Sequence, residues 1–203
     1  MSERIDGVAI TFVAVWLGAV AMGIAGVAHY KSTPGIQADA PAVWPRESRV
    51  HRDLGMPTLV MFAHPRCPCT RASLTELAVL MESLRGKVTA VVILLHPEGT
   101  DDAWKNTDLR ERAASIAGVE VVDDPGGEEA ALFGTVTSGQ ALLYEAGGRL
   151  AFRGGITLAR GHEGDSPGRA RIASLVLAGA AEHDSAPVFG CSLLDRPREA
   201  RSR

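Results

Sequence analysis

The chain has 203 residues, of which 46% are hydrophobic and 22% are charged, and its formal net charge is −3. This composition is typical of a globular protein and excludes the disordered and collagen-like classes. Lysine and arginine total 21 against 24 aspartates and glutamates, so the chain lacks the basic excess that binds nucleic acid, and no nucleic-acid partner is expected. Three cysteines are too few for a disulfide scaffold, and their odd number leaves at least one thiol unpaired within the chain.

The first predicted element is an apolar helix from Val8 to Ala28. This segment has no charged residue and no proline, and at about 1.5 Å per residue it spans the roughly 30 Å hydrocarbon core of a bilayer. We therefore predict a membrane anchor over residues 1–31, with residues 8–28 in the membrane. A cleaved signal peptide is an alternative because Gly26 and Ala28 are small enough for a cleavage site, and a buried helix of a soluble protein is another.

Three further segments follow the anchor. Residues 32–56 are rich in proline and lack periodicity, as expected of a linker. Residues 57–182 alternate apolar strand-like runs with amphipathic stretches and form the predicted domain. Residues 183–203 are a C-terminal tail that carries Cys191.

The domain has the pattern of an α/β fold. Asp101 or Asp102 can cap the second helix, and Gly147-Gly148 indicates a hairpin between the last two strands. This alternation, closed by an antiparallel hairpin, favours a mixed sheet in three layers. The predicted strands are residues 58–62, 88–95, 119–122, 141–144 and 150–152, and the predicted helices are residues 68–86, 104–117, 128–133 and 172–181.

The informative cluster is Cys67-Pro68-Cys69, at the junction of the first strand and the first helix. Free N–H groups and the dipole of a helix N-terminus favour a thiolate over a thiol, and Arg66 and Arg71 act in the same direction. Pro68 suits the first helical turn. Two partly exposed thiols of lowered pKa predict two-electron thiol–disulfide chemistry.

This order of strands and helices around a Cys-Pro-Cys motif resembles the thioredoxin-like superfamily, and within it the membrane-anchored TlpA/ResA-like and RedB-type proteins. The resemblance covers residues 57–182. It implies a redox disulfide at the first helix and a single-pass protein of the bacterial inner membrane whose domain faces the periplasm. The positive-inside rule gives no clear orientation here, so the side of the membrane follows from the implied function.

The sequence departs from that family at two places. The family motif is Cys-x-x-Cys, so either one residue is deleted and Cys67 is the attacking thiol, which we favour, or Arg66 occupies the place of the attacking cysteine. The shorter ring is expected to be strained, which favours an oxidant or isomerase over a strong reductant. The family also has a cis-proline facing the disulfide, in the loop that docks substrate. Here Ser138 and Gly139 occupy that loop, and a trans bond is expected before Gly139.

Three further residues are auxiliary candidates. His162, in a polar, glycine-rich loop, is a possible base or ligand, although the loop can instead serve only to cap the last helix through Asp165 or Ser166. Cys191 lies within reach of the motif as a resolving or metal-ligating residue, or is an idle thiol. His64 can tune the cysteine pKa, ligate a metal, or simply occupy a turn.

The predicted function is a membrane-anchored thiol–disulfide oxidoreductase in which Cys67 attacks a client disulfide and Cys69 resolves the mixed disulfide. It needs no cofactor and no metal, and its partners are client thiols or disulfides and an upstream thiol redox partner. A binding module of the Sco-like type is the alternative, with copper(I) or zinc held by Cys67 and Cys69 together with His162 or Cys191. A degenerate thioredoxin-like scaffold is a third possibility.

Overall fold

The computed structural model describes residues 2–104, 106–179 and 185–193, and it divides into two units, residues 1–33 and 34–203. The first unit is one helix, α1 (Ser2–Ser32). Its segment Ala9–Ser32 has a mean hydropathy of 2.2 and is long and apolar enough to cross a membrane. The predicted apolar helix is therefore confirmed, and by length and composition it suits a membrane anchor or a signal sequence.

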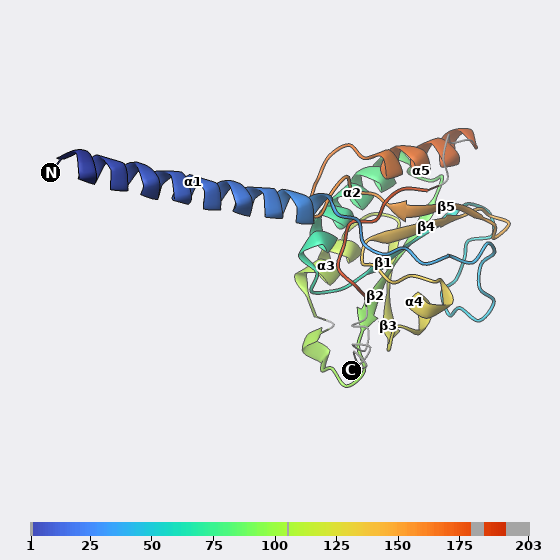
Figure 1. Cartoon of the computed structure of the whole chain (residues 1–203). Helices are drawn as coiled ribbons and strands as arrows, with labels where there is room; N and C mark the ends of the chain where they lie inside the picture. Colours follow the sequence, from blue (N-terminus) through green and yellow to red (C-terminus); the bar gives the residue numbers. More distant parts are fainter. Residues whose placement is uncertain (1, 105, 180–184, 194–203) are drawn as a thin grey trace, which may run out of the picture. The chain divides into compact units, whose positions relative to one another are not determined.

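A single five-stranded sheet forms the centre of the second unit (Figure 1). The strand order is β3-β2-β1-β4-β5, in which β1, β2 and β3 are parallel and β4 and β5 run antiparallel to their neighbours. The predicted mixed sheet with a terminal hairpin is confirmed, and it is the sheet of a thioredoxin-like fold. The strands are β1 (Thr58–Ala63), β2 (Thr89–His96), β3 (Val119–Pro125), β4 (Gln140–Tyr144) and β5 (Leu150–Gly155).

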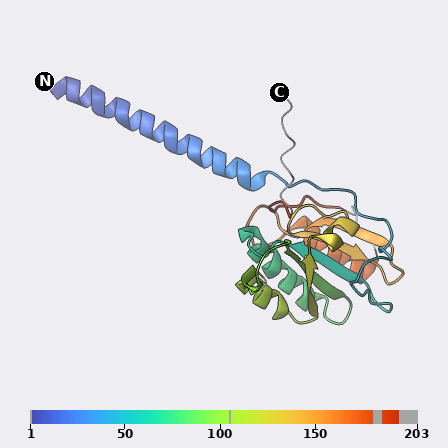
Figure 2. The ribbon, with the colours of Figure 1, turned by 90° about the horizontal axis from the view of Figure 1, so that it is seen from below.

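Helices cover both faces of this sheet, which gives the predicted three layers. Leu59 and Met61 of β1 face a core shared with α2, α3 and α5, whereas Val60 and Phe62 face a core shared with α4, as the period-two alternation of a strand requires. Figure 2 shows α4 on the opposite side of the strands from α2 and α3. The helices are α2 (Pro68–Ser83), α3 (Asp108–Ala114), α4 (Glu128–Leu132) and α5 (Pro167–Ala178), with a short 3-10 turn at Asp102–Trp104.

Two predicted helix starts were wrong, although the Ser166 cap named for the last helix is confirmed. Helix α3 begins at Asp108, after Thr107, whose hydroxyl accepts the N–H of Arg110, and not near Asp101 or Asp102. Helix α5 begins at Pro167, before the predicted start at Ile172, because Ser166 caps it by accepting the N–H of Arg169. It ends at Ala178, where Gly179 adopts a positive φ of 69°.

The segment predicted as a linker is extended but packs against the domain. Trp44 lies edge-on to Phe133 and Tyr144, each with ring centroids 5.1 Å apart, and Val50 is buried in the core on the α4 face. The main chain of Trp44 also donates to the Gly148 carbonyl at 2.8 Å. Residues 34–50 therefore belong to the packed unit.

Candidate active site

Cys67 lies in the turn that connects β1 to α2. It is the N-cap residue of α2, with extended backbone angles, and Pro68 occupies the first helical turn as predicted. The turn before it closes through the Cys67 N–H, which donates to the His64 carbonyl at 3.1 Å, and through the Thr70 hydroxyl, which donates to the same carbonyl at 3.1 Å. Local hydrogen bonding thus holds the Cys67 sulfur over the free N–H groups of the helix.

Ser138 and Gly139, predicted as a substrate loop, are buried and support this turn. The Ser138 hydroxyl accepts the His64 N–H at 2.9 Å and lies 3.0 Å from the Thr70 hydroxyl. Gly139 has a φ of +88°, and its N–H donates to the Phe62 carbonyl at 2.7 Å. No cis peptide bond occurs in the described part of the chain, so the trans bond expected before Gly139 is confirmed.

The C-terminal tail returns to the same turn and brings Cys191 with it. Cys191 Sγ lies 3.0 Å from Cys67 Sγ. The segment runs antiparallel to residues 136–138, because the Ser138 N–H donates to the Cys191 carbonyl at 2.8 Å and the Leu193 N–H donates to the Val136 carbonyl at 2.9 Å. Of the predicted tail, residues 183, 184 and 194–203 lie outside the described residues.

The pKa of Cys67 is lowered from its ordinary value of 9.0. Burial raises this pKa, but hydrogen bonds to the sulfur outweigh the burial. The donors are the Cys191 thiol and the backbone N–H groups of Cys191, Cys69 and Thr70. A thiolate at Cys67 is therefore stabilised by the helix N-terminus, as predicted, and also by the returning tail.

The expectation that both thiols of the motif are partly exposed was wrong for Cys67. Cys67 is only 2% exposed, whereas Cys69 and Cys191 are partly exposed. The tail covers Cys67, since Cys191 Sγ lies 3.0 Å from Cys67 Sγ and the Cys191 N–H donates to the Cys67 sulfur.

The other two thiols are held protonated. Burial, followed by the hydrogen bond to Cys67 and the charge of Cys67, raises the pKa of Cys191 to about 12. Burial, the charge of Cys67 and a hydrogen bond to Cys67 likewise raise the pKa of Cys69. Arg160 opposes both shifts through its positive charge, and the N–H of Gly161 lowers the pKa of Cys69 by a hydrogen bond.

The loop that carries His162 reaches the cysteines through two other residues. His162 is exposed, and the loop acts on the sulfurs through Arg160 and Gly161. Arg160 also donates to the Gly190 carbonyl, which holds the tail next to Cys191. The only signal in the sequence was the proximity of an arginine to a predicted polar loop.

The charged neighbours of the motif have partners of their own. Arg66 lies over the ring of Trp104, 4.0 Å from its centroid, and Arg71 forms an ion pair with Asp108. The His64 ring accepts the Arg66 N–H at 3.1 Å and packs edge-on against Trp104. Arg66 and Arg71 were predicted to favour the thiolate, but the groups found to lower the pKa of Cys67 are hydrogen-bond donors.

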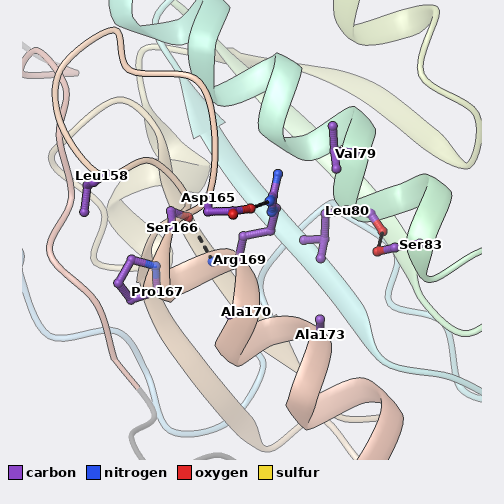
Figure 3. Close-up of a pocket in the computed structure, with 10 residues that line it drawn as sticks. All are labelled: Val79, Leu80, Ser83, Leu158, Asp165, Ser166, Pro167, Arg169, Ala170 and Ala173. Atoms are coloured by element: carbon purple, nitrogen blue, oxygen red, sulfur yellow. Dashed lines mark hydrogen bonds and ion pairs between the residues drawn. The ribbon is translucent and has the colours of Figure 1, made fainter.

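Several hollows border these elements. One of about 380 Å³ borders the turn and has Cys67 in its wall, together with Pro65, Arg66, Pro68, Arg71, Thr107, Asp108 and Leu109. Another, of about 590 Å³, lies between α2 and α5 and contains none of the cysteines (Figure 3). In Figure 3 the Arg169 side chain points toward Asp165 beside this hollow, whose wall also holds apolar side chains and two serines.

The three sulfurs form one compact group. The Sγ atoms of Cys67, Cys69 and Cys191 all lie within 4.8 Å of one another. Such a cluster can exchange disulfides internally, and three soft donors at this spacing can also surround a thiophilic metal ion. His162 is not part of the group.

No protein-family model matches the chain, and no curated protein matches it. Among solved structures, an uncharacterized conserved protein from Geobacillus kaustophilus is similar with a TM-score of 0.57 at 19% identity, over 82% of this chain and 94% of that one. A hypothetical protein from Sinorhizobium meliloti is similar with a TM-score of 0.54 at 22% identity, over 79% of this chain and 93% of that one. At these identities the likeness shows the fold alone.

Proposed function

We propose that this chain is a thiol–disulfide oxidoreductase whose central group is the Cys67 thiolate. The observation that supports this most is the pairing of a buried sulfur of lowered pKa with a second thiol at 3.0 Å, at the N-terminus of a helix. A thiolate beside a thiol is the reduced half of a dithiol–disulfide couple.

The direction of transfer follows from the stabilised thiolate. Hydrogen bonds that lower the pKa of Cys67 stabilise the reduced form, and a stabilised reduced form makes the corresponding disulfide a better oxidant. We therefore infer that the protein oxidises client dithiols, in agreement with the oxidant or isomerase expected from the sequence. The client loses two electrons to the disulfide, which leaves Cys67 as a thiolate and its partner sulfur as a thiol.

The cellular setting follows from the apolar helix. An anchor over α1, with the domain on the oxidising side of a bacterial inner membrane, is the arrangement that the TlpA/ResA-like or RedB-type resemblance implies, and a secreted domain follows if α1 is a signal sequence. Client thiols and an upstream thiol redox partner are its proposed partners.

A redox titration of the full chain in detergent tests this proposal. The chain is equilibrated with mixtures of reduced and oxidised glutathione, and its thiols are counted by alkylation and mass spectrometry. We expect a reversible two-electron couple with a potential less negative than about −220 mV, lost in Cys67→Ser. Absence of any reversible couple in the wild-type chain contradicts the proposal.

A copper(I)-binding module is a second candidate, favoured by the three sulfurs within 4.8 Å of one another. It predicts tight binding of one copper(I) ion per reduced chain in competition with a chelator, and no oxidation of a dithiol peptide. An active redox couple without such copper binding excludes this alternative.

A further inference from the structure

The three thiols allow more than one pairing, and the adjacent pair in the sequence is not the pair that the structure favours. Cys69 lies inside the first turn of α2 while Cys67 is its N-cap. The Cys69 sulfur lies within 4.8 Å of the Cys67 sulfur and forms a hydrogen bond with it. It also receives the N–H of Gly161 and lies in the field of Arg160, so its contacts are divided between Cys67 and the loop after β5.

Cys191, in contrast, is held directly against Cys67. The sulfur–sulfur distance is 3.0 Å, so an approach of about 1 Å would reach the 2.05 Å of a disulfide bond. The hydrogen bond from the Cys191 thiol is the largest of the contributions that lower the pKa of Cys67.

Backbone contacts of the tail hold Cys191 beside Cys67. Main-chain hydrogen bonds pair Cys191 and Leu193 with the strand-like segment 136–138. A Cβ on Gly190 would lie 1.8 Å from the Ser138 carbonyl oxygen, so only glycine permits this close approach. Arg160 donates to the Gly190 carbonyl from the other loop.

Exposure distinguishes the two sulfurs of this pair. Cys67 is 2% exposed, whereas Cys191 is partly exposed. An incoming thiolate therefore has access to Cys191, and the sulfur it displaces is Cys67. A leaving sulfur of lower pKa departs faster. Cys67, which has the lowered pKa, is therefore the better leaving group, and the more accessible Cys191 is the sulfur that is attacked.

We propose that Cys67 and Cys191 form the redox disulfide of this protein, and that Cys191 is the sulfur attacked by a client thiol. This inference rests on the proposed function and identifies Cys191 as the disulfide partner of Cys67. It replaces the Cys67–Cys69 pair expected from the sequence.

The reaction balances without any further group. A client thiolate bonds to Cys191 Sγ as the Cys67–Cys191 bond breaks, and the electron pair of that bond remains on Cys67 as a thiolate. The second client thiolate then attacks the client sulfur of the mixed disulfide, which forms the client disulfide and releases Cys191, and Cys191 takes up a proton. Disulfide exchange with an oxidised thiol partner, such as glutathione disulfide in the test below, restores the Cys67–Cys191 bond.

The first experiment maps the disulfide in the wild-type full chain in detergent, oxidised by glutathione disulfide. Peptide mass spectrometry under non-reducing conditions is expected to find Cys67 joined to Cys191. A Cys67–Cys69 bond as the main product overturns the inference. This measurement uses no variant, so it does not depend on the folding of a mutant.

The second experiment compares Cys69→Ser with Cys191→Ser in the glutathione titration. The Cys69→Ser chain is expected to keep a reversible intramolecular couple whose equilibrium constant lies within about threefold of wild type, and Cys191→Ser is expected to lose it or shift it by more than tenfold. The reverse pattern overturns the inference but leaves the proposed function intact. Absence of a couple in the wild type overturns both.

The third experiment locates the attacked sulfur. Oxidised Cys69→Ser chain is mixed with reduced glutathione and quenched in acid at early times. Glutathione is expected on Cys191 in at least tenfold excess over Cys67. Preferential labelling of Cys67 contradicts the assignment of Cys191 as the point of entry.

Discussion

The guanidinium group of Arg160 donates a hydrogen bond to the carbonyl oxygen of Gly190, the residue before Cys191. This contact joins the loop after β5 to the C-terminal tail at the cysteine cluster. The same guanidinium lowers the pKa of Cys69 and Cys191 through its charge. One side chain therefore contributes both to the position of the tail and to the ionisation of the two partly exposed thiols.

We expect Arg160→Gln to loosen the tail and expose Cys67. A hydrogen bond from a charged donor contributes about 1.5 to 3 kcal/mol, so its loss is expected to raise the population of the open tail by about 10- to 100-fold. The rate at which iodoacetamide modifies Cys67, followed by mass spectrometry above pH 9.0, should rise accordingly. Above that pH an ordinary thiol is ionised, so the rate reports access.

Arg149→Gln is the matched control, because Arg149 is exposed and pairs with Glu145 on the β4–β5 hairpin. It should leave the rate at Cys67 unchanged. An equal acceleration in both variants would contradict the role of Arg160 in holding the tail.

The pH dependence of Cys67 tests the hydrogen bond from Cys191. In a Cys69→Ser background, Cys191→Ala removes the donor, and the pKa of Cys67 is expected to rise. Cys191→Ser keeps a hydroxyl donor, so the rise should be smaller. Thiolate absorbance against pH measures both variants, and identical titration curves for the two would show that the side-chain donor is irrelevant.

The same pKa shift makes the stability of the reduced fold depend on pH. The pKa of Cys67 in the folded state lies below its ordinary value of 9.0, so the thiolate contributes stability that is present above pH 9.0 and lost as the pH falls through the folded pKa. The raised pKa of Cys191 has the opposite sign, and its contribution is lost between pH 9.0 and about 12. Urea unfolding of reduced protein should therefore show stability rising toward pH 9.0, with a weaker rise in Cys67→Ser.

Gly190→Ala tests whether the close approach of the tail is required. The new Cβ would meet the Ser138 carbonyl oxygen at 1.8 Å, so the segment must move away. We expect a loss of about 1 to 3 kcal/mol in the free energy of unfolding and a reduced yield of the Cys67–Cys191 disulfide. Gly147→Ala has nothing within 4 Å of the new Cβ and should change neither. Unchanged disulfide yield in Gly190→Ala would mean that the tail has another way to reach Cys67.

The sheet and the Cys67 helix could be predicted because their signals are local. Apolar runs mark β1 and β2, and a proline after Cys67 marks the first turn of α2. The helix start at Asp108 was missed because the Thr107 hydroxyl competes as a cap with several polar neighbours, and tertiary packing decides among them. Ser166 was named as a possible cap, but the apolar pattern placed the start of that helix at Ile172.

The position of Cys191 has no local signal. Its reach could be calculated from chain length, but its approach to Cys67 depends on backbone pairing with residues 136–138 and on the absence of a side chain at Gly190. The burial of Cys67 has the same cause, since the covering segment is distant in the sequence. Histidine chemistry favoured His162 in the loop after β5, whereas tertiary contacts bring Arg160 to the sulfurs.

Glu76 of α2 holds the loop after β5, and its replacement is expected to lower the free energy of unfolding more than replacement of the exposed Asp165. Its buried carboxylate accepts the Gly164 N–H at 2.6 Å and pairs with Arg169 of α5. Arg169 also pairs with Asp165, which is fully exposed. We expect Glu76→Gln to lower the free energy of unfolding by about 2 to 4 kcal/mol because it leaves a partly buried guanidinium without its buried partner. Asp165→Asn removes only a solvated pair and should cost less than about 1 kcal/mol. Urea unfolding of the two variants measures this difference. Equal losses of unfolding free energy would show that burial of the Glu76 carboxylate does not strengthen the contact between α2 and the loop after β5.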